Sequence, residues 1–216
     1  MKRWIKLSLL LLLATLVYEF FPRLLPQDVA WSSFGGEVVI FLQRNLSSPL
    51  LDWAMFIIYS FVYMIIIYGT GGYLLWKRDF SRFARYLAVF LVVQFLGVIT
   101  WILYPVAPPR VALKNNVREI RTELGGFTEI FNPYPYGAFP SLHVANAFTG
   151  VLFMRFYGRK EKTIWIFLFL AISFSTIYLG EHYWQDVVAG VFYSLAGYLS
   201  IAALSKTKLG SKLFAM

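Results

Sequence analysis

Residues 87–110 read LAVFLVVQFLGVITWILYPVAPPR, an unbroken apolar run that ends in prolines and an arginine. A hydrocarbon layer about 30 Å thick is crossed by roughly 20 apolar residues of helix. The run is continuous and does not alternate every second residue, which indicates a membrane helix and not a barrel strand. We therefore predict a spanning helix over residues 84–106.

The rest of the chain repeats this pattern. Of its 216 residues, 59% are hydrophobic and only 14% are charged, which is not the composition of a soluble protein. Comparable apolar runs predict five further spanning helices, over residues 5–21, 50–76, 140–157, 163–180 and 183–204. A weaker amphipathic stretch over 36–46 predicts a short helix along the interface. The expected fold class is all-α, a polytopic integral membrane protein with six transmembrane helices in one bundle.

The chain shows no boundary between domains. It has no internal repeat, low-complexity tract or linker, so residues 1–216 are expected to form a single membrane-embedded catalytic domain. The first apolar run lacks a convincing small-residue cleavage site and is interpreted as a retained anchor. The chain has no cysteine, which excludes disulfides and thiolate metal sites.

Lysine and arginine are unevenly divided between the two ends of the predicted helices. The amino terminus, the second and fourth connections and the tail hold 14 of them, whereas the first and third connections hold 6. The positive-inside rule then places both termini in the cytoplasm and the third and fifth connections outside, in a protein of the cytoplasmic membrane. Charges dispersed over short loops do not favour nucleic-acid binding.

Unusual polar residues lie at the outer helix ends. YPVAPPR ends one helix at 104–110, FPSLH begins another at 139–143, and STIYLGEHYWQDVVAG joins the last two at 175–190. The chain's two histidines, His143 and His182, are thus expected on one face of the membrane. Asp186 follows His182 by four residues, a helical spacing at which side chains meet. A carboxylate inside a membrane helix costs on the order of 2.5–3.5 kcal/mol, so Asp186 should have a partner and a function.

Several readings of these residues remain open. His143 could be a simple interfacial residue, and YPVAPPR a proline-rich helix stop. Two histidines and an aspartate could hold zinc, although their spacing fits poorly. A serine hydrolase with Ser141 as its nucleophile would leave His143 unused and lacks a glycine-flanked nucleophile turn.

Phosphoryl transfer uses all of these groups. A histidine held by an aspartate can attack phosphorus to give a phosphohistidine, while a second histidine protonates the departing oxygen. The helix amino terminus at FPSLH supplies N–H donors, with Pro140 expected at the first helical position. Arg110 adds a planar charged fork. We therefore expect these groups to form a phosphate cradle that faces outward, with Arg110 as its charged member.

With these motifs the chain resembles the type 2 phosphatidic acid phosphatase superfamily, over roughly residues 84–200. PSLH matches the family's second motif, and Ser175, His182 and Asp186 have the spacing of its third motif. The resemblance implies that His182 is the nucleophile, that Asp186 orients it and that His143 is the general acid. It also implies that Ser141 helps to bind phosphate, and the family's six-helix count agrees with the hydropathy pattern.

The chain departs from the family pattern at four positions. Leu142 replaces the glycine of the second motif, and Thr176 replaces the arginine of the third. In the first motif, Leu103 stands in place of the usual lysine and Val111 in place of the proline. Losing one charged phosphate contact costs about 1.5–3 kcal/mol, so Arg110 or Lys114 is expected to carry more of the phosphate.

The amino-acid sequences of the three motifs are similar to those of the branch that contains inositol phosphorylceramide synthases and their prokaryotic relatives. Those enzymes pass a phosphoryl headgroup to an alcohol. The function expected from the superfamily as a whole is a lipid phosphatase acting on phosphatidic acid or a polyprenyl phosphate or diphosphate, through a phosphohistidine. In this scheme Arg110 and Ser141 bind the non-bridging oxygens, and no metal or cofactor is needed. The alternatives are a headgroup phosphotransferase and a non-catalytic lipid or phosphate carrier. The expected partners are the phospholipid or polyprenyl phosphate substrate and membrane lipids.

Two further segments have a predictable structure. The first half of residues 111–137 is expected to form a short amphipathic helix, and its aromatic second half to cap the site or contact lipid tails. An ordinary outer loop is the alternative there. The glycines of YGTGGY, residues 68–73, are expected to serve helix packing and not phosphate binding.

Overall fold

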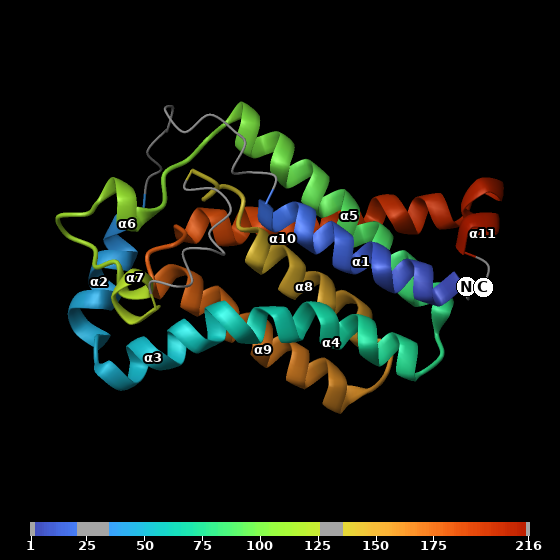
Figure 1. Ribbon diagram of the computed structural model, residues 1–216, viewed down its shortest axis with the longest axis horizontal. Coiled ribbons are helices and arrows are strands. Elements are labelled where there is room, and N and C mark those ends of the chain that lie inside the picture. The colour runs from blue at the N-terminus through green and yellow to red at the C-terminus, as the bar shows by residue number, and fades with distance from the viewer. Residues whose placement is uncertain (1–2, 21–34, 126–135, 215–216) are drawn as a thin grey trace.

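The computed structural model describes residues 3–20, 35–125 and 136–214, and this part of the chain is helical with no strand. Its long helices run side by side along one axis (Figure 1). In chain order the elements are α1 Arg3–Phe20, α2 Gly36–Leu46, α3 Pro49–Ile57, the π-helical turn η2 Ile58–Val62, α4 Tyr63–Trp76, α5 Phe80–Leu103, α6 Pro109–Ala112, α7 Ile120–Gly125, α8 Leu142–Met154, α9 Arg159–Tyr178, α10 Trp184–Ser205 and α11 Lys208–Phe214. The all-helical class is confirmed, and a helix occurs at each predicted position.

Several helices begin or end a few residues from their predicted bounds, and the starts of two of them have local reasons. Helix α5 begins at Phe80, before the predicted start, because the side chain of Asp79 accepts a hydrogen bond from the backbone N–H of Arg82 and caps the helix. Helix α8 begins only at Leu142, with Ser141 as its N-cap. Pro140 therefore precedes the cap, and its predicted place at the first helical position is wrong.

Four segments of the described chain are long and apolar enough to cross a membrane: Pro49–Trp76, Phe80–Leu103, Arg159–Tyr178 and Trp184–Ser205. The other two apolar helices, Ile5–Leu16 and Leu142–Met154, are shorter. The predicted count of six spans is therefore not confirmed. The 13 residues of α8 rise only about 20 Å, which is less than the hydrocarbon thickness.

Helix α8 forms the centre of the bundle. Eleven of its 13 residues are buried, and it packs against α4, α5, α9 and α10. Its amino terminus lies very close to α10, because a Cβ added at Gly190 would stand 2.5 Å from the carbonyl oxygen of Ser141. A helix enclosed in this way is surrounded by protein and need not match the thickness of the bilayer.

Polar side chains inside the bundle pair with one another. Asn146 of α8 donates to the hydroxyl of Tyr63 at 2.8 Å and to the side-chain oxygen of Gln94 at 3.2 Å, while Thr149 and Ser194 share a hydrogen bond of 2.8 Å. Such pairing is expected because an unpaired polar group costs free energy where water is absent. The Asn146 bond also fixes the ring of Tyr63.

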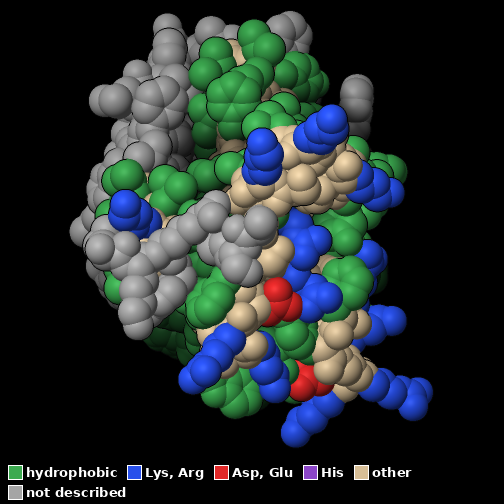
Figure 2. All heavy atoms as spheres, turned by 90° about the vertical axis from the view of Figure 1, so that its right-hand side faces the viewer, with side chains coloured by type: hydrophobic (Ala, Val, Ile, Leu, Met, Phe, Trp, Pro, Cys, Tyr) green, Lys and Arg blue, Asp and Glu red, His purple; other side chains and the backbone are tan. Residues whose placement is uncertain are grey.

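The two ends of the bundle differ in charge. Near the described chain ends, lysine and arginine side chains spread over the surface and outnumber acidic ones (Figure 2). These basic residues come from the α4–α5 connection, the α8–α9 connection and the carboxyl-terminal region. That grouping follows the division found in the sequence. The membrane face that this end meets stays a prediction from the positive-inside rule.

Short elements close the opposite end. Helix α2 coincides with the predicted amphipathic stretch, and its Gln43 donates to the carbonyl of Tyr178 at 2.9 Å and accepts from the N–H of Arg118 at 2.8 Å. Two short helices, α6 at its start and α7 at its end, lie in the first half of the 111–137 segment, where one amphipathic helix was expected. Most of the aromatic second half lies outside the described residues.

Candidate active site

His182 lies in the tight connection between α9 and α10. The carbonyl of Thr176, near the end of α9, accepts hydrogen bonds of 3.1 Å from the N–H groups of both Glu181 and His182. The connection turns through Gly180, whose φ of +73° is a conformation that side chains with a Cβ rarely adopt. The carbonyl of Gly180 accepts from the N–H of Arg110 at 2.9 Å, which joins the first and third motifs directly.

The imidazole of His182 has a defined tautomer. Its Nδ1 lies 2.7 Å from the carbonyl oxygen of Ala138. A carbonyl only accepts, so Nδ1 must carry the hydrogen, and in the neutral ring Nε2 holds the free electron pair. Ala138 is held in place because its own N–H donates to the carbonyl of Val106 at 3.1 Å.

Asp186 contacts His182 less directly than the sequence suggested. Its Oδ2 is 3.7 Å from Nδ1 of His182, beyond hydrogen-bond distance, and accepts instead from the N–H of Tyr183 at 2.7 Å as part of the cap of α10. We predicted that one helix would carry both His182 and Asp186. Helix α10 begins only at Trp184, so His182 lies before the helix and that prediction is wrong. Asp186 is therefore a fully buried carboxyl group close to the ring, and its Oδ1 has no hydrogen-bond partner among the described residues.

His143 lies in the first turn of α8, facing His182. The two imidazole centroids are 6.0 Å apart, close enough for both rings to contact a single phosphate group. Two tyrosines from the 49–76 segment hold the ring of His143: Tyr59 stacks on it at 4.3 Å and Tyr63 tilts against it at 4.2 Å. Neither tyrosine belongs to a motif, and an aromatic residue within an apolar helix gives no sign of this contact.

Ser141 ties the two histidine-bearing regions together. It is fully buried, and its N–H donates to the carbonyl of Asp186 at 3.0 Å, which joins the start of α8 to the start of α10. Its hydroxyl accepts from the N–H of Val144 at 3.4 Å in the cap of α8. The structure thus brings Ser141, His143, His182 and Asp186 together at one end of the bundle.

Two buried arginines share one carboxylate beside His182. The Nε of Arg110 donates to Oε1 of Glu181 at 2.9 Å, and an Nη of Arg121 lies 3.4 Å from the same oxygen. Burial by itself would raise the pKa of Glu181, but the charges of Arg110 and then Arg121 outweigh it and lower the pKa to about 2. The glutamate is therefore ionised at neutral pH and compensates part of the arginine charge.

Arg121 was not predicted as a site residue. Its guanidinium lies over the ring of Tyr59 at 5.5 Å, and Tyr59 in turn stacks on His143. Lys114, by contrast, is exposed and lines a surface hollow of the α6–α7 connection. The hydroxyl of Thr176, at the position of the family's third-motif arginine, donates to the carbonyl of Ser173 within α9. The second buried arginine therefore comes from α7.

Sequence signals for Arg121 and Glu181 existed but were weak. Both residues lie in the outer connections, in stretches that already contained predicted site residues. An arginine in an amphipathic segment is ordinarily interpreted as a solvated residue, and a glutamate beside His182 has no fixed role in the motif. Only the folding of α7 against the α9–α10 connection brings the two side chains together.

Comparisons with known proteins identify the family of this chain. The family model of the PAP2 superfamily matches residues 30–200. The chain is 28% identical over 153 residues to the phosphoinositol dihydroceramide synthase of Bacteroides thetaiotaomicron, covering 62% of this chain and 50% of that protein. It is 37% identical over 60 residues to the inositol phosphorylceramide synthase of Candida albicans, covering 28% of this chain and 13% of that protein. The chain thus spans half or less of the curated relatives that it matches, and no solved structure matches it.

Proposed function

The chain belongs to the PAP2 superfamily, and from this premise we propose that it is a membrane-embedded enzyme that cleaves a phosphate ester or anhydride of a lipid. The candidate substrates are phosphatidic acid and polyprenyl phosphates or diphosphates. The observation that carries the proposal is the pair of imidazoles 6.0 Å apart beside two buried arginines. That set of groups suits a tetrahedral anion whose oxygens carry the charge.

In the first step, Nε2 of His182 attacks phosphorus. Because Nδ1 carries the hydrogen and donates it in a hydrogen bond to the Ala138 carbonyl, the electron pair on Nε2 is available for the new N–P bond. The bond between phosphorus and the lipid oxygen breaks, and the departing oxygen takes a proton from protonated His143. The buried charge of Asp186, 3.7 Å from Nδ1, stabilises the positive charge that develops on the His182 ring.

In the second step, water attacks the phosphorus of the phosphohistidine. His143, now neutral, takes the proton from that water, the N–P bond breaks, and inorganic phosphate leaves with His182 restored. The nucleophile must be neutral and the acid protonated at the start. Turnover is therefore expected to follow a bell-shaped pH profile.

Arg110 and Arg121 are proposed to bind the non-bridging oxygens, with Ser141 and the N–H groups at the start of α8. Glu181 positions both guanidinium groups and keeps them together despite their like charge. Arg121 then supplies the second charged contact that the third motif lacks at Thr176.

A second candidate function is transfer of a phosphoryl headgroup to a lipid alcohol, which the names of the two relatives favour. In that reaction an alcohol takes the place of water in the second step, and the same residues act. The chemistry of the site does not choose between water and an alcohol. The acceptor depends on what the surrounding helices admit.

Purified protein in detergent provides the test. We expect phosphate release from phosphatidic acid or polyprenyl diphosphate in the presence of a metal chelator, and its loss in His182→Ala and His143→Ala variants with unchanged thermal stability. Full turnover in both variants would overturn the assigned roles. Lipid binding by the wild type without any turnover would indicate a carrier.

The acceptor is tested in the same preparation. A phosphatidylinositol donor is supplied with and without dihydroceramide, and the products are separated by mass spectrometry. Headgroup transfer that requires dihydroceramide identifies a transferase. Release of inositol phosphate to the same extent with and without the alcohol identifies a hydrolase.

A further inference from the structure

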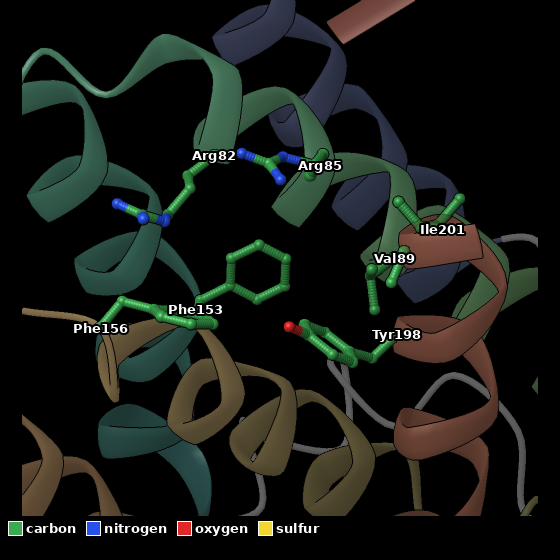
Figure 3. Close-up of a pocket in the computed structure, with 8 residues that line it drawn as sticks. Arg82, Arg85, Val89, Phe153, Phe156, Tyr198 and Ile201 are labelled. Carbon is green, nitrogen blue, oxygen red and sulfur yellow. The ribbon is translucent and has the colours of Figure 1, made fainter. Parts of the chain in front are cut away.

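A second group of basic side chains lies at the opposite end of the bundle from the histidines. A cavity of about 130 Å³ opens there between α5, α10 and the end of α8 (Figure 3). Its lining includes Arg82 and Arg85 from α5 and Tyr198 from α10. Along α8 the lining residue Phe153 is ten residues from His143, a rise of about 15 Å, so this cavity is separate from the proposed active site.

The charge around the cavity is positive and only partly compensated. Arg82 pairs with Asp79 at the start of α5, whereas the hydrogen bonds that Arg85 makes within the described part of the chain go to the neutral oxygens of Ser81, at 3.3 and 3.4 Å. Arg155 stands beside the cavity and donates to the hydroxyl of Tyr198 at 3.0 Å. Among the described residues, neither Arg85 nor Arg155 forms an ion pair with a carboxylate.

The remaining wall is apolar. Val89, Phe153, Ile201 and Ala202 line the cavity together with the ring of Phe156. Figure 3 shows Arg82 and Arg85 along one side, with Val89 and Ile201 on α5 and α10 below them. Guanidinium groups above apolar helix surfaces match the two parts of a phospholipid, its phosphate and the first carbons of its chains.

We propose that this cavity, hereafter the basic pocket, binds the headgroup phosphate of an anionic phospholipid that is not the enzyme's substrate. Its volume suits a headgroup whose acyl chains remain in the bilayer. Its position at the end of a membrane bundle, amid a broad basic surface, favours a lipid over a soluble anion (Figure 2). The bound lipid would compensate the charge of Arg85 and Arg155 and join α5 to α10.

The test measures lipid binding to the delipidated, detergent-purified protein, by native mass spectrometry and by the change in Tm. Phosphatidylglycerol is expected to bind and raise Tm, whereas phosphatidylcholine is not. An arginine that contacts the bound headgroup is expected to contribute ~1 kcal/mol, which corresponds to about fivefold in affinity. Arg85→Gln is thus expected to weaken phosphatidylglycerol binding about fivefold, and Arg85→Gln with Arg155→Gln further, while Arg85→Lys keeps most of it.

Two control variants distinguish the basic pocket from the general basic surface and from the active site. Arg159→Gln removes an exposed charge at the same end that does not line the pocket, so it is expected to leave the affinity unchanged. Arg121→Gln weakens the proposed active site and is expected to leave the lipid-dependent rise in Tm intact. The proposal is overturned if Arg121→Gln abolishes that rise while Arg85→Gln does not, if Arg159→Gln has the same effect as Arg85→Gln, or if glycerol phosphate matches the lipid.

Discussion

At the scale of single residues, the candidate site depends on a few partners that no motif contains. The carbonyl of Ala138 sets the tautomer of His182, two tyrosines hold His143, and Glu181 gathers the two arginines. The motif residues themselves were predicted from the sequence, because histidines and carboxylates in apolar helices are rare. Their partners are ordinary residues, and no pattern distinguishes them before the chain folds.

Arg121 offers the sharpest test at this scale. Arg121→Gln is expected to lower kcat/KM about 10- to 100-fold, because a charged hydrogen bond to phosphate contributes about 1.5–3 kcal/mol. Arg121→Lys should recover only part of the activity, since an ammonium cannot reproduce the planar fork. Lys114→Gln on the same segment is the matched control and should behave as wild type. An equal loss in Lys114→Gln would contradict the assignment of Arg121.

Ionisation of Glu181 is expected to make the stability of the fold depend on pH in the acid range. The pKa of Glu181 is about 2 in the folded protein and about 4.3 in the unfolded chain. Its ionised carboxylate therefore stabilises the fold fully above about pH 4.3, and this stabilisation is lost as the pH falls toward 2. Glu181→Gln should lower stability by about 3–5 kcal/mol at pH 7, because it leaves two buried guanidinium groups without their carboxylate.

Thermal unfolding measured from pH 7 to pH 3 checks this prediction. The difference in Tm between wild type and Glu181→Gln should narrow steadily below about pH 4.3. Glu123→Gln, which alters an exposed pair with Arg118, serves as the control and should change Tm little. A difference that stays constant over the whole range would refute the role given to Glu181.

At the scale of elements, helix packing sets the distance between the two histidines. Helix α8 carries His143, and the connection before α10 carries His182, so the contact between the starts of α8 and α10 positions one ring against the other. Gly190 permits that contact. The sequence predicted where both helices lie but not how close they approach, because a glycine in a membrane helix has several common uses.

Gly190→Ala tests this packing. The added methyl would meet the carbonyl of Ser141, so the helices must separate or strain, with an expected loss of about 1–3 kcal/mol in stability and a lower kcat. Gly72→Ala is the matched control, because nothing lies within 4 Å of the added atom. The prediction is checked by measuring Tm and the rate of phosphate release for both variants. Wild-type turnover in Gly190→Ala would show that the contact does not set the geometry of the site.

At the scale of the whole molecule, composition and hydropathy predicted the all-helical bundle. The number of membrane spans could not be predicted in the same way, because a run of apolar residues does not distinguish a lipid-facing helix from one enclosed by protein. Helix α8 is the instructive case. Its apolar sequence predicted a span, yet its neighbours cover nearly every residue and it is too short to cross the bilayer alone.

Orientation in the membrane is testable because the chain has no cysteine. Single cysteines are introduced in two exposed connections, as Asn115→Cys between α6 and α7 and as Lys160→Cys at the start of α9. A membrane-impermeant maleimide applied to intact cells should label the first and reach the second only after permeabilisation. The reverse pattern would place the histidines on the cytoplasmic face.

The segment of residues 49–62 is sensitive to length as well as to composition, because Asp52 and Tyr59 both have fixed partners outside it. Tyr59 lies within the π-helical turn at residues 58–62, whereas Asp52, about two turns earlier, pairs with Arg118 and Tyr178. Deleting one residue between Asp52 and Tyr59 would rotate the preceding helix by about 100° and withdraw Asp52 from both partners. Homologues are therefore expected to tolerate substitutions along residues 49–62 far more readily than single-residue insertions or deletions.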